Sequence, residues 1–97
     1  MIRHIVLLKW ADSATDAQKQ AVTDGLAKLP AVISELKRYD LGSDAGISEG
    51  NHDFAIVAEF DDVDGYAVYR DHPEHLKVIT EHIKPILAGR AAVQMLI

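Results

Sequence analysis

Two kinds of hydrophobic spacing alternate along this chain, and their order restricts the possible folds more than any other feature. Apolar residues recur at every second position, as in β-strands, in residues 2–10, 53–60 and 90–97. Apolar residues recur at helical spacing in residues 15–29 and in the stretch that follows Pro73. Residues 35–46 form a weaker strand pattern. The predicted order is therefore strand, helix, strand, strand, helix, strand.

The second helical region is expected to be split in two. Asp61 or Asp62 is predicted to cap a short helix, and Pro73 opens another, because its missing N–H is not needed at a helix start. Pro85 removes a hydrogen bond inside that helix, so its last turn should kink or loosen. Gly89 is expected to break the chain before the final strand. The first helix has a simpler start, because Thr15 and Gln18 have the spacing of a capping box.

These elements predict an α+β domain that spans residues 1–97. It is a ferredoxin-like βαββαβ protomer, with an antiparallel four-stranded sheet and helices on one face. Strand periodicity places four residues of the first strand under the helices, namely His4, Val6, Leu8 and Trp10. The other face is expected to keep apolar residues without a cover, namely Ile5, Leu7, Ala55, Val57, Ala92 and Leu96.

An uncovered apolar face of this kind typically marks association. We therefore predict a homodimer whose two sheets pack face to face around a twofold axis. The alternative is a solvated sheet face with scattered apolar residues, which is common in antiparallel proteins.

The composition narrows the classes of function. The chain has no cysteine, so it forms no disulfide and no thiolate metal site, and this suits a reducing, cytoplasmic location. The net charge is −5 and no basic block stands out, which argues against nucleic acid or an anionic membrane as partner. The opening run MIRHIVLLKWAD is too short and too charged for a signal or membrane segment. No glycine-rich phosphate loop occurs, and we expect no cofactor.

His4 is the one polar residue that the first strand places beneath the helices. A buried imidazole without a partner costs about 1–3 kcal/mol. Taken alone, His4 is explained most simply as a core histidine bonded to a backbone carbonyl or a tyrosine hydroxyl. The stretch YRDHPEH supplies Tyr69 and His75, which can point into the same gap, and helical spacing places His82 on the same edge as His75. The first three define a candidate pocket with apolar walls and few polar groups.

The chemistry of these residues suggests a base and an oxyanion donor. Free amides at the helix start favour neutral imidazole and lower the pKa of His75. A neutral histidine can act as a base near neutral pH, and the Tyr69 hydroxyl can hydrogen-bond a developing enolate or phenolate oxygen. The hypothesis is proton transfer or enolate chemistry on a small carbonyl compound, with His75, Tyr69 and His4 as candidate catalytic residues.

His72 and His75 also have the H-x-x-H spacing of a metal pair, but no third ligand follows at a diagnostic spacing. We therefore expect no metal, and expect His72 to be an N-cap or loop residue.

Several motifs together resemble the stress-responsive α/β-barrel (Dabb) domain family. They are the opening strand HIVLLKW, a T-x-x-Q helix start, a strand ending in F-D, the Y-x-x-H-P-x-H run of residues 69–75 and the I-K-P-I of residues 83–86. The resemblance covers nearly the whole chain and implies a ferredoxin-like protomer whose dimer forms an α/β barrel. One branch of this family contains a cofactor-independent polyketide cyclase that performs an aldol-type ring closure. The functional histidine and tyrosine of that enzyme fall on His75 and Tyr69, and its first-strand histidine falls on His4.

Three functional classes follow, and the sequence leaves open whether the protein is an enzyme. The first is a cofactor-independent cyclase or proton-transfer enzyme. The second is a non-catalytic module that binds a small aromatic or polyketide-like ligand. The third is a structural, stress-associated dimer without a ligand, which is favoured if His4, Tyr69 and His75 bond one another and close the pocket. A cavity between His4 and His75 would favour the first two.

Overall fold

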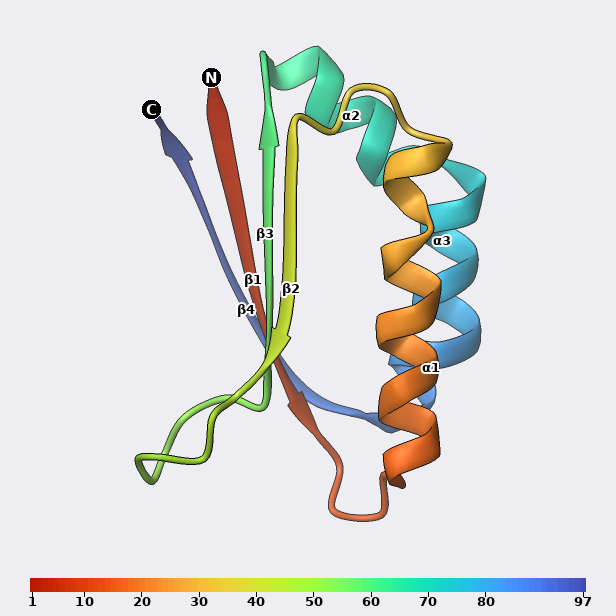
Figure 1. The fold of residues 1–97 in the computed structure, drawn as a ribbon, viewed down its shortest axis with the longest axis vertical. Helices are drawn as coiled ribbons and strands as arrows, with labels where there is room; N and C mark the ends of the chain where they lie inside the picture. The colour runs from red at the N-terminus through yellow and green to blue at the C-terminus, as the bar shows by residue number, and fades with distance from the viewer.

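The protein consists of one antiparallel sheet with all of its helices on one face (Figure 1). The computed structural model describes residues 1–97, and the strands lie in the order β2-β3-β1-β4. The elements are β1 (Ile2–Trp10), α1 (Asp16–Ala27), β2 (Arg38–Ser43), β3 (Phe54–Phe60), α2 (Val63–Asp71), α3 (Pro73–Val78) and β4 (Leu87–Leu96). This is the predicted ferredoxin-like βαββαβ arrangement. None of the helices is long and apolar enough to span a lipid bilayer.

The helix starts follow the predicted capping chemistry. At α1, the Gln18 amide donates to Thr15 Oγ1 over 3.2 Å and the Thr15 amide donates to Gln18 Oε1 over 2.9 Å, which completes the capping box. Asp62 caps α2 by accepting from the amide of Gly65 at 2.8 Å. His72 caps α3 with Nδ1, which accepts from the amide of residue 74 at 3.1 Å. His72 is thus an N-cap, as expected.

Beyond α3 the helix continues with a wider, π-helical turn before the chain enters β4. A π-helical turn spans Ile79–Ile83 and a 3₁₀ turn spans Lys84–Ile86. The Lys84 amide bonds to the carbonyl of Ile79, five residues back, and Pro85 has no N–H with which to continue an α-helical ladder. The predicted loosening near Pro85 is therefore confirmed.

This widening also separates two histidines that helical spacing placed together. His75 faces the interior between the helices and the sheet, whereas His82 faces α1 and lines a surface pocket with Gly25. The expectation that His75 and His82 share one edge is wrong, because the π-helical turn changes the angle between successive side chains.

The last strand differs from its prediction in extent and in register. It begins at Leu87 and includes Gly89, so Gly89 does not break the chain, and a register shift beside Lys9 and Trp10 accommodates the early start. Ile5 pairs with Val93, so alternation puts Val93 and its second neighbours on the face away from the helices. The predicted placement of Ala92 and Leu96 on that face is therefore wrong.

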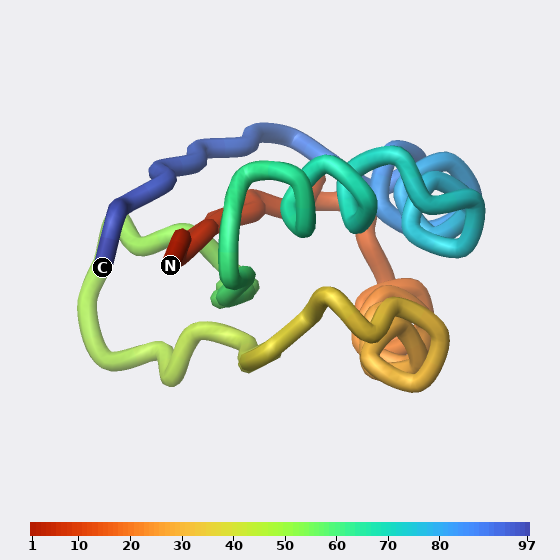
Figure 2. The backbone as a smooth tube through the Cα atoms, turned by 90° about the horizontal axis from the view of Figure 1, so that it is seen from above, coloured from red at the N-terminus to blue at the C-terminus, as the bar shows by residue number.

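The core lies between the sheet and the helices, and it is closely packed. Val22 and Leu26 of α1 are fully buried, and so are Ala58 and Phe60 of β3. In Figure 2, α1 lies toward the β2 side of the sheet and α3 toward the β4 side, while α2 runs from the sheet toward α3. This arrangement leaves α2, α3, β1 and β4 around one end of the core, where the polar residues gather.

The face of the sheet away from the helices, here called the open face, has no cover within the chain. Its middle is apolar and comprises Ile5, Leu7, Ala55, Val57, Ala91, Val93 and Met95. Of these, Leu7, Val93 and Met95 expose 37%, 55% and 39% of their surface. At one end, Glu59 accepts from Arg3 Nε at 2.8 Å and lies 3.4 Å from Arg38 Nη1.

Candidate functional site

A cavity of about 330 Å³ lies between the helices and the β1 side of the sheet. Its walls are mostly apolar and come from β1, β3, α2, α3, the turns before β4 and the first residues of β4. Three of the polar residues on its lining are His4, Tyr69 and His75, so the structure brings the sequence-predicted site residues together.

His75 is held so that one of its ring nitrogens is free. Its Nδ1 lies 3.1 Å from the backbone carbonyl of Arg70. A carbonyl oxygen can only accept a hydrogen bond, so Nδ1 carries the proton and Nε2 of the neutral ring keeps its lone pair. Burial lowers the pKa of His75 below 6.5, although the bond to the Arg70 carbonyl opposes that shift. His75 is therefore neutral at pH 7 and offers Nε2 as a base.

Tyr69 packs against the ring of His75 and bonds to a second tyrosine. The two ring centres of Tyr69 and His75 are 4.1 Å apart. The Tyr69 hydroxyl lies 3.0 Å from the hydroxyl of Tyr39. Burial raises the pKa of Tyr69 to about 12, while the bond to Tyr39 works in the opposite direction. The phenol is therefore protonated at pH 7, and with Tyr39 as donor the Tyr69 proton is free to bond a ligand oxygen.

His4 is buried with a side-chain partner, which differs from the expected carbonyl or tyrosine hydroxyl. It exposes 4% of its surface, and its Nδ1 lies 3.2 Å from Nε2 of Gln94 on β4. Because an amide nitrogen donates, Nδ1 is the acceptor and the neutral ring carries its proton on Nε2. Burial lowers the pKa of His4 to about 4, aided by the charge of Arg90 and by His75. His4 is thus neutral at pH 7 and is a hydrogen-bond donor.

The two histidines therefore have complementary states. His75 has an unprotonated Nε2, and His4 has a protonated one. No hydrogen bond joins the side chains of any two of the three predicted residues, because these side chains bond to the Arg70 carbonyl, to Tyr39 and to Gln94. The backbone of Tyr69 does act on His75, where its hydrogen bond opposes the lowering of the His75 pKa. A purely structural role was expected if these three side chains bonded one another and closed the pocket, and the structure shows neither.

Sequence reasoning missed Tyr39, Gln94 and Arg90. Tyr39 pairs with Ala58 in the sheet, so it shares the helix-facing side, and strand parity over residues 35–46 would have found it. Gln94 and Arg90 face the helices because they pair with His4 and Leu8. The register shift in β4 hid that placement, since no sequence pattern marks it.

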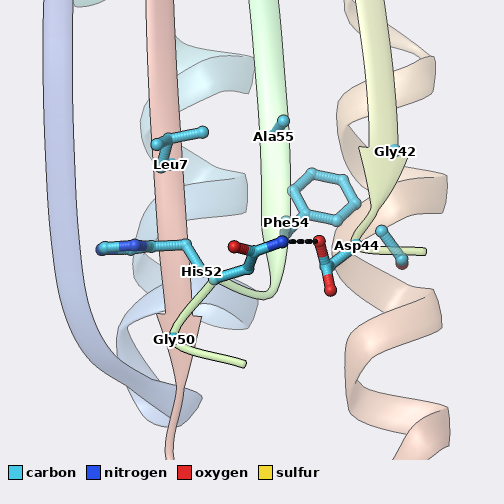
Figure 3. Close-up of a pocket in the computed structure, with 9 residues that line it drawn as sticks. Leu7, Gly42, Asp44, Gly50, His52, Phe54 and Ala55 are labelled. Atoms are coloured by element: carbon cyan, nitrogen blue, oxygen red, sulfur yellow. Dashed lines mark hydrogen bonds between the residues drawn. The ribbon is translucent and has the colours of Figure 1, made fainter. Parts of the chain in front are cut away.

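The remaining polar clusters form no comparable site. No group of three His, Asp or Glu side chains is close enough to hold a metal ion. Figure 3 shows a second, shallow pocket of about 380 Å³ on the open face, beside the loop of residues 44–53. There Asn51 Nδ2 donates to Asp44 Oδ1 over 3.1 Å, and His52 lines the rim. None of the sequence-predicted catalytic residues lines this pocket.

The fold and the chain have known relatives. The sequence profile of the stress responsive A/B barrel domain matches residues 2–96. A dimeric ferredoxin-like protein of unknown function from Thermobifida fusca is 48% identical, with 99% of this chain and 90% of that chain covered and a TM-score of 0.92. A dimeric ferredoxin-like protein of unknown function from Bacteroides fragilis is 27% identical, with 99% and 95% covered and a TM-score of 0.87.

A third similar structure has a named activity. The hydroxynitrile lyase from Passiflora edulis is 19% identical, with 99% of this chain and 92% of that chain covered and a TM-score of 0.85, a likeness that concerns the fold alone. No protein of curated function matches the sequence. The profile match over residues 2–96, together with the ferredoxin-like fold, shows that this chain belongs to the stress responsive A/B barrel domain family.

Proposed function

We propose that this protein is a cofactor-independent enzyme that moves protons on a small carbonyl compound, with aldol-type ring closure as the reaction class. The observation that carries the proposal is a neutral, half-buried His75 on a mostly apolar cavity, with Nδ1 bonded to the Arg70 carbonyl. That bond fixes the proton on Nδ1 and leaves Nε2 as the acceptor, which is the state that a general base needs.

The proposed reaction assigns one role to each residue. His75 Nε2 takes a proton from the carbon next to a carbonyl, and the C–H electron pair becomes the enolate double bond. The Tyr69 hydroxyl and His4 Nε2–H donate hydrogen bonds to the enolate oxygen, which stabilises the charge that develops there. The enolate carbon then attacks a second carbonyl, and the resulting alkoxide takes the proton back from His75. No external acid or cofactor is consumed.

The Passiflora edulis hydroxynitrile lyase supports this reaction class, since its name describes bond cleavage next to a carbon–oxygen group on the same fold. A second candidate function is a module that binds a small molecule in the same cavity without turnover. The cavity of about 330 Å³ supports both, and turnover separates them.

We also propose a homodimer that forms through the open face. The apolar strip of Ile5, Leu7, Ala55, Val57, Ala91, Val93 and Met95 has no cover in the chain. The similar proteins from Thermobifida fusca and Bacteroides fragilis are described as dimeric. Two sheets packed in this way would bury both strips and leave each helix-side cavity on its own protomer.

The test is proton exchange on carbon, because exchange needs only the first step. The protein is incubated in D₂O with 4-phenyl-2-butanone, related small ketones and a cyanohydrin, and NMR follows deuterium incorporation or cleavage. We expect His75→Gln to lose the catalysed rate by about 100-fold or more. The matched control is His82→Gln, which removes a helical histidine outside the cavity and should leave the rate unchanged. A wild-type rate in His75→Gln would refute the role of His75, and bound ligand without any exchange would favour the binding module.

A further inference from the structure

The charge on the cavity differs from the charge of the protein. The chain as a whole has a net charge of −5. The cavity lining contains three cations, Arg70, Lys84 and Arg90, and one carboxylate, Asp71, so its balance is two positive charges. An acidic protein with a cationic lining around an apolar cavity has a local preference for anions.

One of the three cations is already neutralised. Arg70 donates from Nε and Nη2 to the two oxygens of Asp71, at 2.9 and 2.8 Å. Its guanidinium also lies 5.9 Å from the centre of the Tyr66 ring. Arg70 and Asp71 therefore form a closed pair and leave the charges of Lys84 and Arg90 uncompensated.

Lys84 and Arg90 form no ion pair with any carboxylate of the chain. Both are exposed members of the lining, so they lie where the cavity meets solvent. Arg90 is on β4 and pairs with Leu8, which puts its side chain on the helix side of the sheet. Its charge also acts on His4, Tyr69 and His75, since it lowers the pKa of each.

We infer that the cavity takes an apolar carboxylic acid, whose carboxylate pairs with Arg90 at the mouth while its body lies against Ile56, Ile79, Ile83 and Leu87. The planar guanidinium of Arg90 matches a carboxylate with two parallel hydrogen bonds, and Lys84 adds a second positive charge beside it. The inference rests on the proposed function only in naming the substrate class of the same cavity, and binding can be tested without turnover.

The test compares two probes of the same shape that differ in charge, 3-phenylpropanoate and 3-phenylpropanamide, by calorimetry at low ionic strength. We expect the carboxylate to bind about 10-fold or more tightly than the amide, since hydrogen bonds between charged groups are the stronger ones. Arg90→Gln should remove most of that difference and leave amide binding unchanged, and Arg90→Lys should keep part of it. The control Lys77→Gln removes an exposed cation of α3 outside the cavity and should bind both probes like the wild type.

The outcomes separate this inference from the proposed function. Equal affinity for the two probes, or a carboxylate preference that survives Arg90→Gln, overturns the role of Arg90 but leaves the His75 chemistry untouched. Carboxylate binding that persists in His75→Gln while carbon-proton exchange is lost supports both. Carboxylate binding that depends on Arg90, with no exchange on any ketone or keto acid, supports the anion site and refutes the enzyme proposal. If neither probe binds, the inference is wrong.

Discussion

The two faces of the four-stranded sheet differ in how their burial matches their polarity. Along β1 and β3 the helix-facing side is buried, and yet this side of the sheet carries His4 and Tyr39, with Tyr69 of α2 packed against them. The open face has no cover in the chain, and yet its middle is apolar. A buried polar group costs free energy unless it is paired, and an exposed apolar strip is unusual unless it is covered.

This difference between the two faces indicates which function each face can have. On the helix side every buried side-chain nitrogen and oxygen has a partner, so the polar residues are compatible with a stable core. Their partners nevertheless leave Nε2 of His75 and the cavity free. On the open face the apolar strip has no cover within the chain, and the open face of a second copy of the chain can bury it. One side thus offers chemistry and the other association.

The largest effect is expected from the helix side. Leu8→Ala removes a side chain that exposes 2% of its surface, so it should lower the free energy of unfolding by about 2–5 kcal/mol. Leu7→Ala, one position along the same strand but on the open face, should cost clearly less in the monomer, because only a second protomer would cover Leu7. Urea unfolding measures both costs at a protein concentration low enough for the dimer to have dissociated. Equal costs would mean that the two faces do not differ in burial as described.

The open face is tested by a charge in its middle. Val57→Asp would bury a charge from each protomer in the interface of a face-to-face dimer, so the dimer dissociation constant should rise by at least about 100-fold. Sedimentation equilibrium measures it, and circular dichroism checks that the protomer stays folded. Val32→Asp, which adds the same charge to an exposed position away from the sheet, should have no effect on assembly. An unchanged dimer in Val57→Asp would place the interface elsewhere.

His4 should make stability depend on pH. Its pKa is about 4 in the folded protein and 6.5 in the unfolded chain, so the unfolded state binds more protons between those values. Folding stability therefore falls as the pH drops from 6.5 toward 4, by on the order of 2–3 kcal/mol from this residue. His4→Gln should lose that part of the decrease. Urea unfolding of both proteins at pH 7 and pH 4.5 isolates it, since the other titrating groups are shared, and parallel pH curves would contradict the burial of His4.

The smallest effect concerns the tyrosine pair. Tyr39→Phe and Tyr69→Phe each remove one hydroxyl of a 3.0 Å hydrogen bond, so each should cost about 1 kcal/mol. The double variant should cost less than the two single costs together, because both act on one bond. Thermal or urea unfolding of the four proteins gives the coupling, and strict additivity would show that the two hydroxyls do not interact.

Much of this arrangement could be predicted from the sequence. Alternation in β1 and β3, the Thr15–Gln18 capping box and Pro73 are local signals, and local signals determine elements. Their order was enough for the ferredoxin-like fold. The meeting of His4 with Tyr69 and His75 followed from β1 parity and the start of α3, because both are fixed by nearby residues.

The rest depended on long-range geometry. The register of β4 against β1 is set by a shift beside Trp10, and its sequence has small residues on both faces, so alternation alone could not orient it. This is why Arg90 and Gln94 were missed. The π-helical turn after α3 reflects Pro85 acting together with packing against α1, and it moved His82 away from the cavity.

The most direct test of the central claim is the protonation state of His75. Long-range proton–nitrogen NMR of the imidazole side chains, recorded at pH 7, distinguishes the two nitrogens of each ring. We expect His75 to be neutral with the proton on Nδ1 and a bare Nε2, and that Nε2 signal to move when 3-phenylpropanoate or a keto acid is added. A protonated ring, or a neutral ring with its proton on Nε2, would contradict the role of His75 as the base of this cavity.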